Sequence, residues 1–348
     1  MSASEQLTYF GKIYPPDEAW LAKQPHEPIL DPDLPIIDPH HHLWDRPNHR
    51  YLLDDFLADV RTGHNIVATV FEECNSMYRA SGPEELRSVG ETEFVAGIAA
   101  MSASGLYGPT RVAAGIVGFA DLTFGDRVEP VLEALIRAGG GRFRGVRHSA
   151  GWDASEAIGN SRTATGPHVL RQADFRAGLA RLTTLGLSLD AWLYHPQLDD
   201  VIDLARALPG TPIIMCHVGG PLGYGPYAGK RDEVFAAWNT KITELATCPN
   251  VVMKLGGMIN RLAAYDYRAL PAPVSSAELA GFWRPYMETC IERFGPDRCM
   301  FESNFPVEKM GISWAALWNA FKRIAAGASA EEKLALFSGT ARRVYRLD

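Results

Sequence analysis

The sequence predicts a single (β/α)8 barrel, and three observations support this fold class. Short apolar runs alternate with longer amphipathic segments, the pattern of parallel strands joined by helical crossovers. Eight such units fit between residues 36 and 348, which suits a closed barrel with loop insertions. No Gly-x-Gly-x-x-Gly loop follows the first apolar run, so an open dinucleotide-binding sheet would lack its phosphate loop.

The composition is that of a globular protein with an ample core: of 348 residues, 47% are hydrophobic and 22% are charged, and the net charge is −7. No Lys/Arg block occurs, which argues against a nucleic-acid partner. No apolar run could span a membrane, the first residues lack the apolar core of a secretory signal, and the five cysteines are unclustered. We therefore expect a cytoplasmic protein with reduced thiols. Its expected partner is a small anionic molecule, because Arg147 could clamp a substrate carboxylate. The sequence leaves open whether it forms a homo-oligomer.

Residues 1–35 contain six prolines and are expected to form an extended arm on the barrel, anchored by Tyr14 and Trp20. The barrel itself is expected to occupy residues 36–348, without a boundary for a second domain. Two long loops, 219–231 and 257–280, are expected to act as lids.

Strands are predicted at eight short apolar runs, most of which end in polar or charged residues. They cover residues 36–42, 66–71, 114–121, 143–148, 187–195, 212–217, 250–255 and 300–304. Helices are predicted where apolar residues recur at helical spacing. They cover residues 52–60, 84–104, 128–138, 175–185, 198–208, 230–246, 314–324 and 331–343.

The first predicted strand leads into the run Ile36-Ile-Asp-Pro-His-His-His-Leu-Trp-Asp45. Side chains alternate between the faces of a strand, so His40 and His42 point to one side and His41 to the other. Two imidazoles on one side can share a divalent metal ion, with ring nitrogens roughly 2.0–2.1 Å from it. A lone His-x-His fits a pair of structural histidines equally well, and the position directly after the first strand favours the metal interpretation.

Polar residues end most of the predicted strands, and in this fold those ends meet at the face that carries the active site. In chain order they are His40, His42, Glu73, Asp121, Arg147, His148, His195, His217, Lys254, Glu302 and Asn304. Five of the ten histidines are therefore expected at one face. Each alone is compatible with a structural role, but five together predict a metal-assisted or histidine-driven site.

Four motifs at these strand ends resemble the amidohydrolase superfamily: His40-x-His42, His195-Pro196, His217-x-Gly219 and Ser303-Asn304-Phe-Pro306. The similar branch is the amidohydrolase-related family, which holds sugar-acid lactonases, pyrone-dicarboxylate lactonase and aminocarboxymuconate-type decarboxylases. Arg147 in Gly-Val-Arg and the segment 338–345 resemble its lactonase group. The resemblance covers residues 36–347; it is specific for the fold and poorly specific for the substrate.

The resemblance implies that His40, His42 and His195 bind a divalent metal ion. Glu73 is a further candidate ligand, and His217 is the implied catalytic acid or base. Zinc is the metal that these ligands favour. Some relatives in the lactonase group work without metal, with histidines and arginines holding the carbonyl oxygen, so a metal-free site is the alternative.

One departure from the family lies at the end of the eighth strand. Relatives usually carry there an Asp that binds metal and takes a proton from the attacking water, whereas this chain has Asn304. A neutral amide cannot be a general base and is a poorer metal ligand than a carboxylate. Glu302, two residues earlier on the same face, is the candidate replacement, with Glu73 second. A buried ion pair between Glu302 and Lys254 on the neighbouring strand is an equally weighted alternative.

Arg147 is the expected clamp for a substrate carboxylate, because a guanidinium group binds one with two parallel hydrogen bonds. An ion pair to an acidic neighbour such as Asp121 or Asp153 is the alternative. The other residues expected to bind substrate are His148, Trp152, Tyr224, Tyr227 and Lys254.

The function that these inferences favour is hydrolysis of a carboxylated or sugar-derived lactone by metal- or histidine-assisted attack of water. The first alternative is metal-dependent, non-oxidative decarboxylation of an aromatic or muconate-like acid, because His195-Pro196 resembles those decarboxylases. The second is a catalytically inactive barrel that binds a small acid, for which Asn304 is the sole support.

Overall fold

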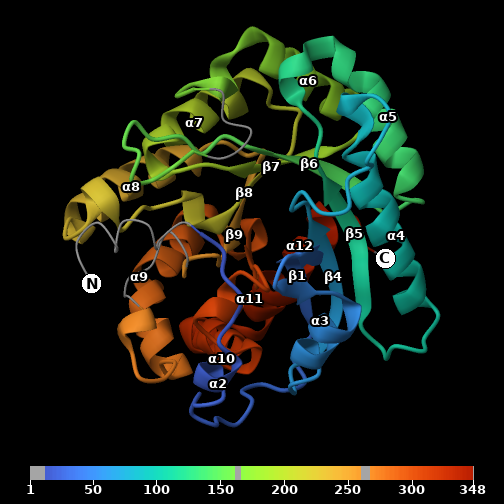
Figure 1. The fold of residues 1–348 in the computed structure, drawn as a ribbon. Helices are drawn as coiled ribbons and strands as arrows, with labels where there is room; N and C mark the ends of the chain where they lie inside the picture. The colour runs from blue at the N-terminus through green and yellow to red at the C-terminus, as the bar shows by residue number, and fades with distance from the viewer. Residues whose placement is uncertain (1–11, 161–165, 260–266, 348) are drawn as a thin grey trace.

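The computed structural model describes residues 12–160, 166–259 and 267–347 and confirms the predicted (β/α)8 barrel (Figure 1). Its wall is one sheet of eight parallel strands: β1 (Ile36–His41), β4 (Ile66–Glu72), β5 (Arg111–Gly118), β6 (Phe143–Ser149), β7 (Ser188–Trp192), β8 (Ile213–Met215), β9 (Val251–Leu255) and β10 (Cys299–Phe301). Each strand pairs with the next one of the sheet along the chain. The order follows from the alternating pattern, because each helical crossover lays a strand beside the one before it.

Backbone contacts between the first and last strands close the barrel at the level of the predicted site. The amide of Asn304 donates to the carbonyl of His40 at 2.9 Å, and the amide of His42 donates to the carbonyl of Phe305 at 2.8 Å. The segment after β10 therefore lies directly beside the end of β1. Closure brings Asn304 to the His-x-His motif across 262 positions of sequence.

Helices cover the outside of the barrel (Figure 1). They are α2 (Glu18–Leu21), α3 (Leu53–Val60), α4 (Val89–Ala103), α5 (Glu129–Ala138), α6 (Ala173–Thr184), α7 (Leu198–Ala207), α8 (Arg231–Leu245), α9 (Ser276–Phe294), α10 (Trp314–Ile324), α11 (Ala330–Leu334) and α12 (Thr340–Val344). Strand and helix side chains such as Phe71, Leu189 and Trp283 pack in one large apolar cluster. Each fully buried side chain of this size contributes roughly 1.5–3 kcal/mol relative to exposure, so this layer holds the strand ends in place.

The structure corrects the sequence interpretation between β9 and β10. The predicted lid over 257–280 ends early, because α9 begins at Ser276. Ser275 Oγ accepts a hydrogen bond from the amide of Glu278, and the Glu278 carboxylate accepts one from the amide of Ser275. This capping box satisfies amides that the first helical turn leaves unpaired, and its Ser-x-x-Glu pattern was the sequence signal for the helix. Residues 260–266 of the predicted lid lie outside the described residues.

The last predicted helix, 331–343, is interrupted. A π-helical segment, Ala335–Gly339, separates α11 from α12, and Ser338 Oγ donates within it to the carbonyl of Leu334. A hydroxyl that bonds back to the preceding turn competes with the helical ladder and bends it. The bend leads the chain to Tyr345, whose ring is fully buried at the barrel.

A two-stranded hairpin follows β1 and is absent from the sequence prediction. Its strands β2 (Trp44–Arg46) and β3 (His49–Tyr51) pair antiparallel. Each has three residues, too few for a strand period to be recognised. The hairpin fixes Trp44 and Arg46 immediately after the His-x-His motif.

The described part of the N-terminal segment, residues 12–35, contacts the barrel. Trp20 Nε1 donates to the carbonyl of Leu270 at 2.9 Å, and Lys322 Nζ donates to the carbonyl of Leu30 at 2.7 Å. Residues 1–11 of the predicted arm lie outside the described residues. Within the described parts of the chain, none of the helices has both the length and the apolar character needed to cross a membrane. All five cysteines are buried free thiols.

Candidate active site

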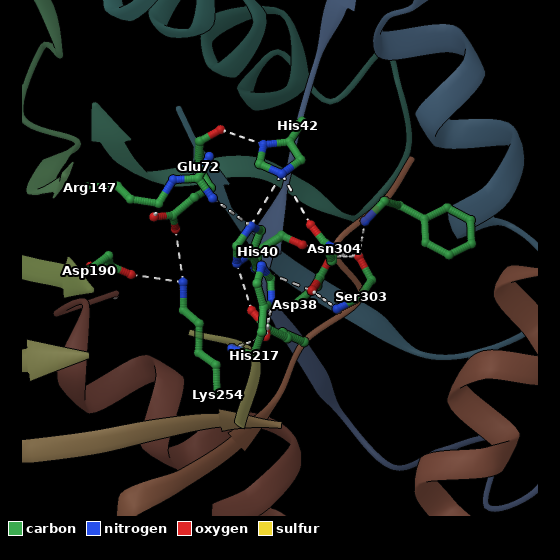
Figure 2. Close-up of polar contacts among 12 residues, drawn as sticks. Asp38, His40, His42, Glu72, Arg147, Asp190, His217, Lys254, Ser303 and Asn304 are labelled. Atoms are coloured by element: carbon green, nitrogen blue, oxygen red, sulfur yellow. Dashed lines mark hydrogen bonds and ion pairs between the residues drawn. The ribbon is translucent and has the colours of Figure 1, made fainter. Parts of the chain in front are cut away.

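The His-x-His motif has the geometry that strand alternation predicts. His40 and His42 lie on one side of the end of β1, with their Nε2 atoms 3.2 Å apart (Figure 2). His41 points away; its Nε2 lies 2.9 Å from Thr69 Oγ1 and its ring stacks on Phe56. His41 therefore belongs to the packing of the barrel, whereas His40 and His42 belong to the site.

The contacts of the two imidazoles determine which nitrogens carry hydrogen. His42 Nδ1 lies 2.8 Å from the carbonyl oxygen of Glu72, which can only accept, so Nδ1 is the protonated nitrogen. His40 Nδ1 lies 2.6 Å from Glu302 Oε2 and carries a hydrogen for the same reason. Burial holds the pKa of both histidines well below the usual value, so each ring is neutral. Both Nε2 atoms therefore present lone pairs, and these lone pairs face each other.

A third acceptor, Asn304 Oδ1, reaches the same point and lies 3.2 Å from His42 Nε2. Asn304 Nδ2 donates to Glu308 Oε1 at 3.3 Å, and the Glu308 carboxyl group also accepts from the amide of Ile259 at 3.1 Å. This contact turns the amide so that its oxygen faces the histidines. Asn304 has a φ of 53°, in the left-handed region that asparagine tolerates better than most residues.

The three acceptor atoms fit a divalent metal ion. Lone pairs that face one point repel each other unless a cation or a hydrogen-bond donor lies among them; here Arg147 Nη1 lies 3.3 Å from His40 Nε2, and the acceptors of His42 and Asn304 remain for an ion. Two nitrogens bound to one tetrahedral zinc at roughly 2.0–2.1 Å are about 3.3 Å apart, and the two Nε2 atoms are 3.2 Å apart. Imidazole nitrogen combined with oxygen is a donor set that zinc and other transition metals accept. His40, His42 and Asn304 are the residues that would hold the ion.

Glu302 is fully buried and bridges two histidines. Its Oε1 accepts from Nδ1 of His217 at 2.7 Å and from the His217 amide at 3.0 Å, while its Oε2 lies 2.6 Å from His40 Nδ1. Burial raises the pKa of this carboxyl group, but the contacts with His217 and His40 outweigh burial and hold the pKa well below its usual value. The three side chains lie close enough to surround an ion, yet both carboxylate oxygens already lie against imidazole nitrogens. Glu302 is thus placed to orient the histidines.

The alternative ion pair between Glu302 and Lys254 does not form. Lys254 Nζ donates to Glu72 Oε2 and to Asp190 Oδ2, both at 2.8 Å, and all three side chains are fully buried (Figure 2). Asp190 also accepts from the Tyr345 hydroxyl at 2.5 Å. In the register of β9 and β10 Lys254 lies opposite Met300, two residues before Glu302, so the two are not cross-strand neighbours.

Lys254→Met is expected to destabilise the protein by roughly 3–5 kcal/mol, because it leaves the Glu72 and Asp190 carboxylates buried without their cation. Urea unfolding measures the loss. Adding Glu72→Gln removes one of the two buried carboxyl groups that Lys254 contacts and is expected to recover part of the stability. A Lys254→Met variant as stable as wild type would contradict this buried ion triad.

His217 follows β8 on a turn with left-handed backbone: φ is 53° at His217 and 48° at Val218. Residues other than glycine rarely take this conformation, and those that do cluster at functional sites. Gly257 makes room for the ring, because a Cβ atom there would lie 1.9 Å from His217 Nδ1. The turn directs Nδ1 at Glu302, so that Nδ1 donates its hydrogen and Nε2 carries the lone pair. A general base requires this tautomer.

Arg147, in β6, is held by an acidic neighbour, as the alternative interpretation expects, but the neighbour is Glu73. Its Nε donates to Glu73 Oε1 at 2.8 Å and its Nη2 donates to the Glu73 carbonyl. The remaining nitrogen, Nη1, lies 3.3 Å from His40 Nε2. Asp121 and Asp153 have other partners. In this structure Glu73 is therefore the nearer counter-charge of Arg147, and Glu72 Oε1 lies 3.8 Å from the same Nε.

A cavity of about 190 Å³ opens beside these residues. Its lining combines charged, polar and aromatic side chains: Ile13, His42, Trp44, Arg46, Glu73, Cys74, Asn75, Phe119, Arg147, Ser149 and Trp192. Pockets for drug-sized ligands measure roughly 300–1,000 Å³, so this cavity suits a single small ring.

Residues 37–347 match the Amidohydrolase family. The chain belongs to the amidohydrolase family. It is 33% identical over 339 residues to the uncharacterized protein y4mH of Sinorhizobium fredii, which covers 90% of this chain and 99% of that protein. It is 28% identical over 244 residues to the L-fucono-1,5-lactonase of Burkholderia multivorans, 68% of this chain and 72% of the lactonase. The structure of a zinc-bound amidohydrolase from Burkholderia multivorans is similar with a TM-score of 0.68 at 25% identity, covering 90% of this chain and 99% of the other. The predicted family, and with it a hydrolase, is confirmed.

Among the described residues, the ring nitrogens of His40, His42 and His195 do not form one group close enough to share a metal ion. β7 ends at Trp192, and His195 lies on the turn that follows. Its Nδ1 accepts from the amide of Leu222 at 3.3 Å, and its ring packs on Tyr227 at 4.9 Å. The role of His195 as a metal ligand therefore stays a prediction, and in this structure Asn304 Oδ1 is the third acceptor beside His40 and His42.

Of the residues predicted to bind substrate, Arg147 lines the cavity and the others lie elsewhere in the described structure. His148 Nδ1 accepts from the amide of Leu122 at 3.3 Å, in a fully buried position. The Tyr224 hydroxyl donates to a backbone carbonyl at 3.0 Å, and the Tyr227 hydroxyl donates to an aspartate at 2.7 Å. Trp152 is held by its amide, which donates to a glutamine side chain at 2.9 Å. Lys254 lies in the buried ion triad.

Three residues that contact the candidate site residues or line the cavity are missing from the sequence prediction: Asp190, Glu308 and Arg46. Asp190 carried a signal, because a charged residue inside an apolar strand needs a buried partner. Glu308 lies four residues after Asn304. This spacing corresponds to one turn of chain and lets the two side chains meet. The position of Arg46 depends on the hairpin, which has no recognisable sequence pattern.

Proposed function

We propose that this amidohydrolase opens the ring of a small lactone with water, assisted by a divalent metal ion held by His40, His42 and Asn304. The observation that carries the proposal is the convergence of His40 Nε2, His42 Nε2 and Asn304 Oδ1 beside a cavity of single-ring size. The similarity to the L-fucono-1,5-lactonase supports a lactone as the substrate class.

His217 is proposed to be the general base that takes a proton from the attacking water at Nε2. Its Nδ1 hydrogen stays with Glu302, whose negative charge stabilises the imidazolium ion that forms. The protonated His217 then returns a proton to the ring oxygen that leaves the carbonyl carbon. Glu302 itself is not proposed as the base, because both of its oxygens face imidazole nitrogens.

The metal ion, when bound, supplies a Lewis acid that polarises the lactone carbonyl and lowers the pKa of water to about 7. Oxygen atoms of Glu72, Glu302 and Glu308 each hold one of the proposed ligands in orientation. Such outer partners fix the tautomer and direction of metal ligands, and their loss typically costs 10–100-fold in metal affinity or activity. Arg147 adds positive charge where the carbonyl oxygen becomes negative.

The test begins with metal analysis of the purified protein. Initial rates are then measured on a panel of aldonolactones and muconolactones, before chelation, after removal of metal, and after addition of zinc or manganese. We expect hydrolysis of at least one lactone, its loss on chelation and its recovery with metal. Full activity after complete metal removal would overturn the proposed metal site, but the proposed lactonase function would still stand. Release of carbon dioxide from aromatic acids, with no lactone hydrolysed, would overturn the function.

Asn304→Asp is expected to tighten metal binding, because a carboxylate replaces a neutral amide oxygen beside His42. Calorimetric titration of the metal-free protein with zinc measures the change. Asn304→Ala is the matched control, and its affinity should fall below that of wild type. Equal zinc affinities in all three proteins would show that Asn304 is not a ligand.

A further inference from the structure

Arg46 is a half-buried guanidinium group at the cavity that contains His42. It ends β2, and the hairpin pairs it with His49. Its guanidinium carbon lies 4.1 Å from the centre of the Trp44 ring, and its Nη2 donates to the carbonyl of Cys74 at 2.6 Å. A guanidinium group stacked on a buried tryptophan has a fixed plane, and its edge N–H groups stay available for further hydrogen bonds.

The charge of Arg46 has no acidic counterpart in the described structure. Among the described residues no carboxylate lies within ion-pair distance of it, and both of its contacts are with neutral groups. Arg147, the other arginine of the cavity, differs: Glu73 neutralises it, and its third nitrogen approaches His40. Of the two guanidinium groups, Arg46 is the one whose charge is uncompensated at the cavity.

A half-buried cation without a counter-ion attracts an anion of matching shape. A guanidinium edge binds a carboxylate with two parallel N–H···O hydrogen bonds, which gives direction as well as affinity. We infer that Arg46 binds a carboxylate of the substrate and thereby selects anionic lactones over neutral ones. The inference rests on the proposed function. It adds the class of lactone that is hydrolysed and the residue that recognises its carboxylate. Arg147, whose Nη1 lies 3.3 Å from His40 Nε2, keeps the role beside the lactone carbonyl proposed above.

The experiment compares Arg46→Met with Arg50→Met. Both arginines lie on the same hairpin and both variants remove one positive charge, but Arg50 is exposed and lies opposite Asp45. The substrates are D-glucono-1,4-lactone and D-glucaro-1,4-lactone, which share the same ring. The first carries a terminal hydroxymethyl group where the second carries a carboxylate. Arg46→Met is expected to raise KM for the carboxylated lactone about 10- to 100-fold. It should leave the neutral lactone within a few-fold of wild type. Arg50→Met should change neither.

Calorimetry with the open-chain acids separates this inference from the proposed function, since binding needs no turnover. Wild type and Arg50→Met should bind D-glucarate more tightly than D-gluconate, and Arg46→Met should lose that difference. If no lactone is hydrolysed but the preference for glucarate depends on Arg46, the carboxylate site stands and the lactonase function fails. The inference is overturned if wild type shows no preference for the dicarboxylate. It is also overturned if Arg46→Met weakens the charged and neutral ligands equally.

Discussion

Replacing both His40 and His42 with alanine is expected to lower turnover by about 10³-fold or more and to remove the bound divalent metal. Their Nε2 atoms are two of the three acceptors that converge at the site. A metal ion that stabilises transition-state charge contributes several kcal/mol, and each 1.36 kcal/mol is tenfold in rate. Turnover of the best lactone and metal content per chain are the two measurements.

His41→Ala is the matched control for this double variant. His41 lies between the two site histidines in sequence but on the opposite face, where its ring stacks on Phe56 at 4.2 Å. Its removal is expected to lower the unfolding temperature while metal content stays at the wild-type level. If the double variant keeps activity within a few-fold of wild type, the catalytic site lies elsewhere in the barrel.

Strand alternation explains why much of the site could be predicted from the sequence. The side on which a residue points depends only on its position within a strand, so the pairing of His40 with His42 and the separation of His41 needed no tertiary information. The meeting of strand ends at one face likewise follows from the parallel barrel. These two rules were enough to bring His217, Glu302 and Asn304 to the same region as the His-x-His motif.

The partners of the buried charges could not be predicted in the same way. Lys254 and Glu302 lie on adjacent strands, but the register that sets Lys254 opposite Met300 is a property of the closed barrel. Lys254 instead reaches Glu72 and Asp190, which lie 182 and 64 positions away in the sequence. A charged residue at a buried position of the sequence indicates that it has a partner, but the sequence does not identify that partner.

The residue at which a strand ends is a second feature that the sequence pattern did not predict correctly. The predicted fifth strand ran to His195, whereas β7 stops at Trp192. Three residues of turn are enough to carry a side chain away from the strand-end cluster. Trp192 is consequently the residue of this segment that meets the site, with its ring 5.0 Å from that of His217.

Glu302→Gln is expected to lower kcat by about 10²–10⁴-fold while the protein stays folded. The carboxylate now accepts the Nδ1 hydrogen of His217 at 2.7 Å, and its other oxygen lies 2.6 Å from Nδ1 of His40. An amide of the same shape has one oxygen and one NH₂ group, so one of the two imidazoles would face a donor with its own N–H. That ring must then move its hydrogen to Nε2. In His40 this removes a lone pair from the proposed metal site, and in His217 it removes the lone pair of the proposed base.

The tautomer change is what distinguishes this orienting role from direct proton transfer by Glu302. Nitrogen NMR of the labelled histidines should show one ring converted to the Nε2–H form in Glu302→Gln. Glu308→Gln is the control, because Glu308 contacts Asn304; it should weaken metal binding and leave the His217 tautomer unchanged. Adding Lys254→Met to Glu302→Gln should not restore stability, since the two side chains are not partners. A Glu302→Gln protein that is both stable and fully active would exclude the orienting role and the base role alike, and Glu73 would be the next candidate for the base.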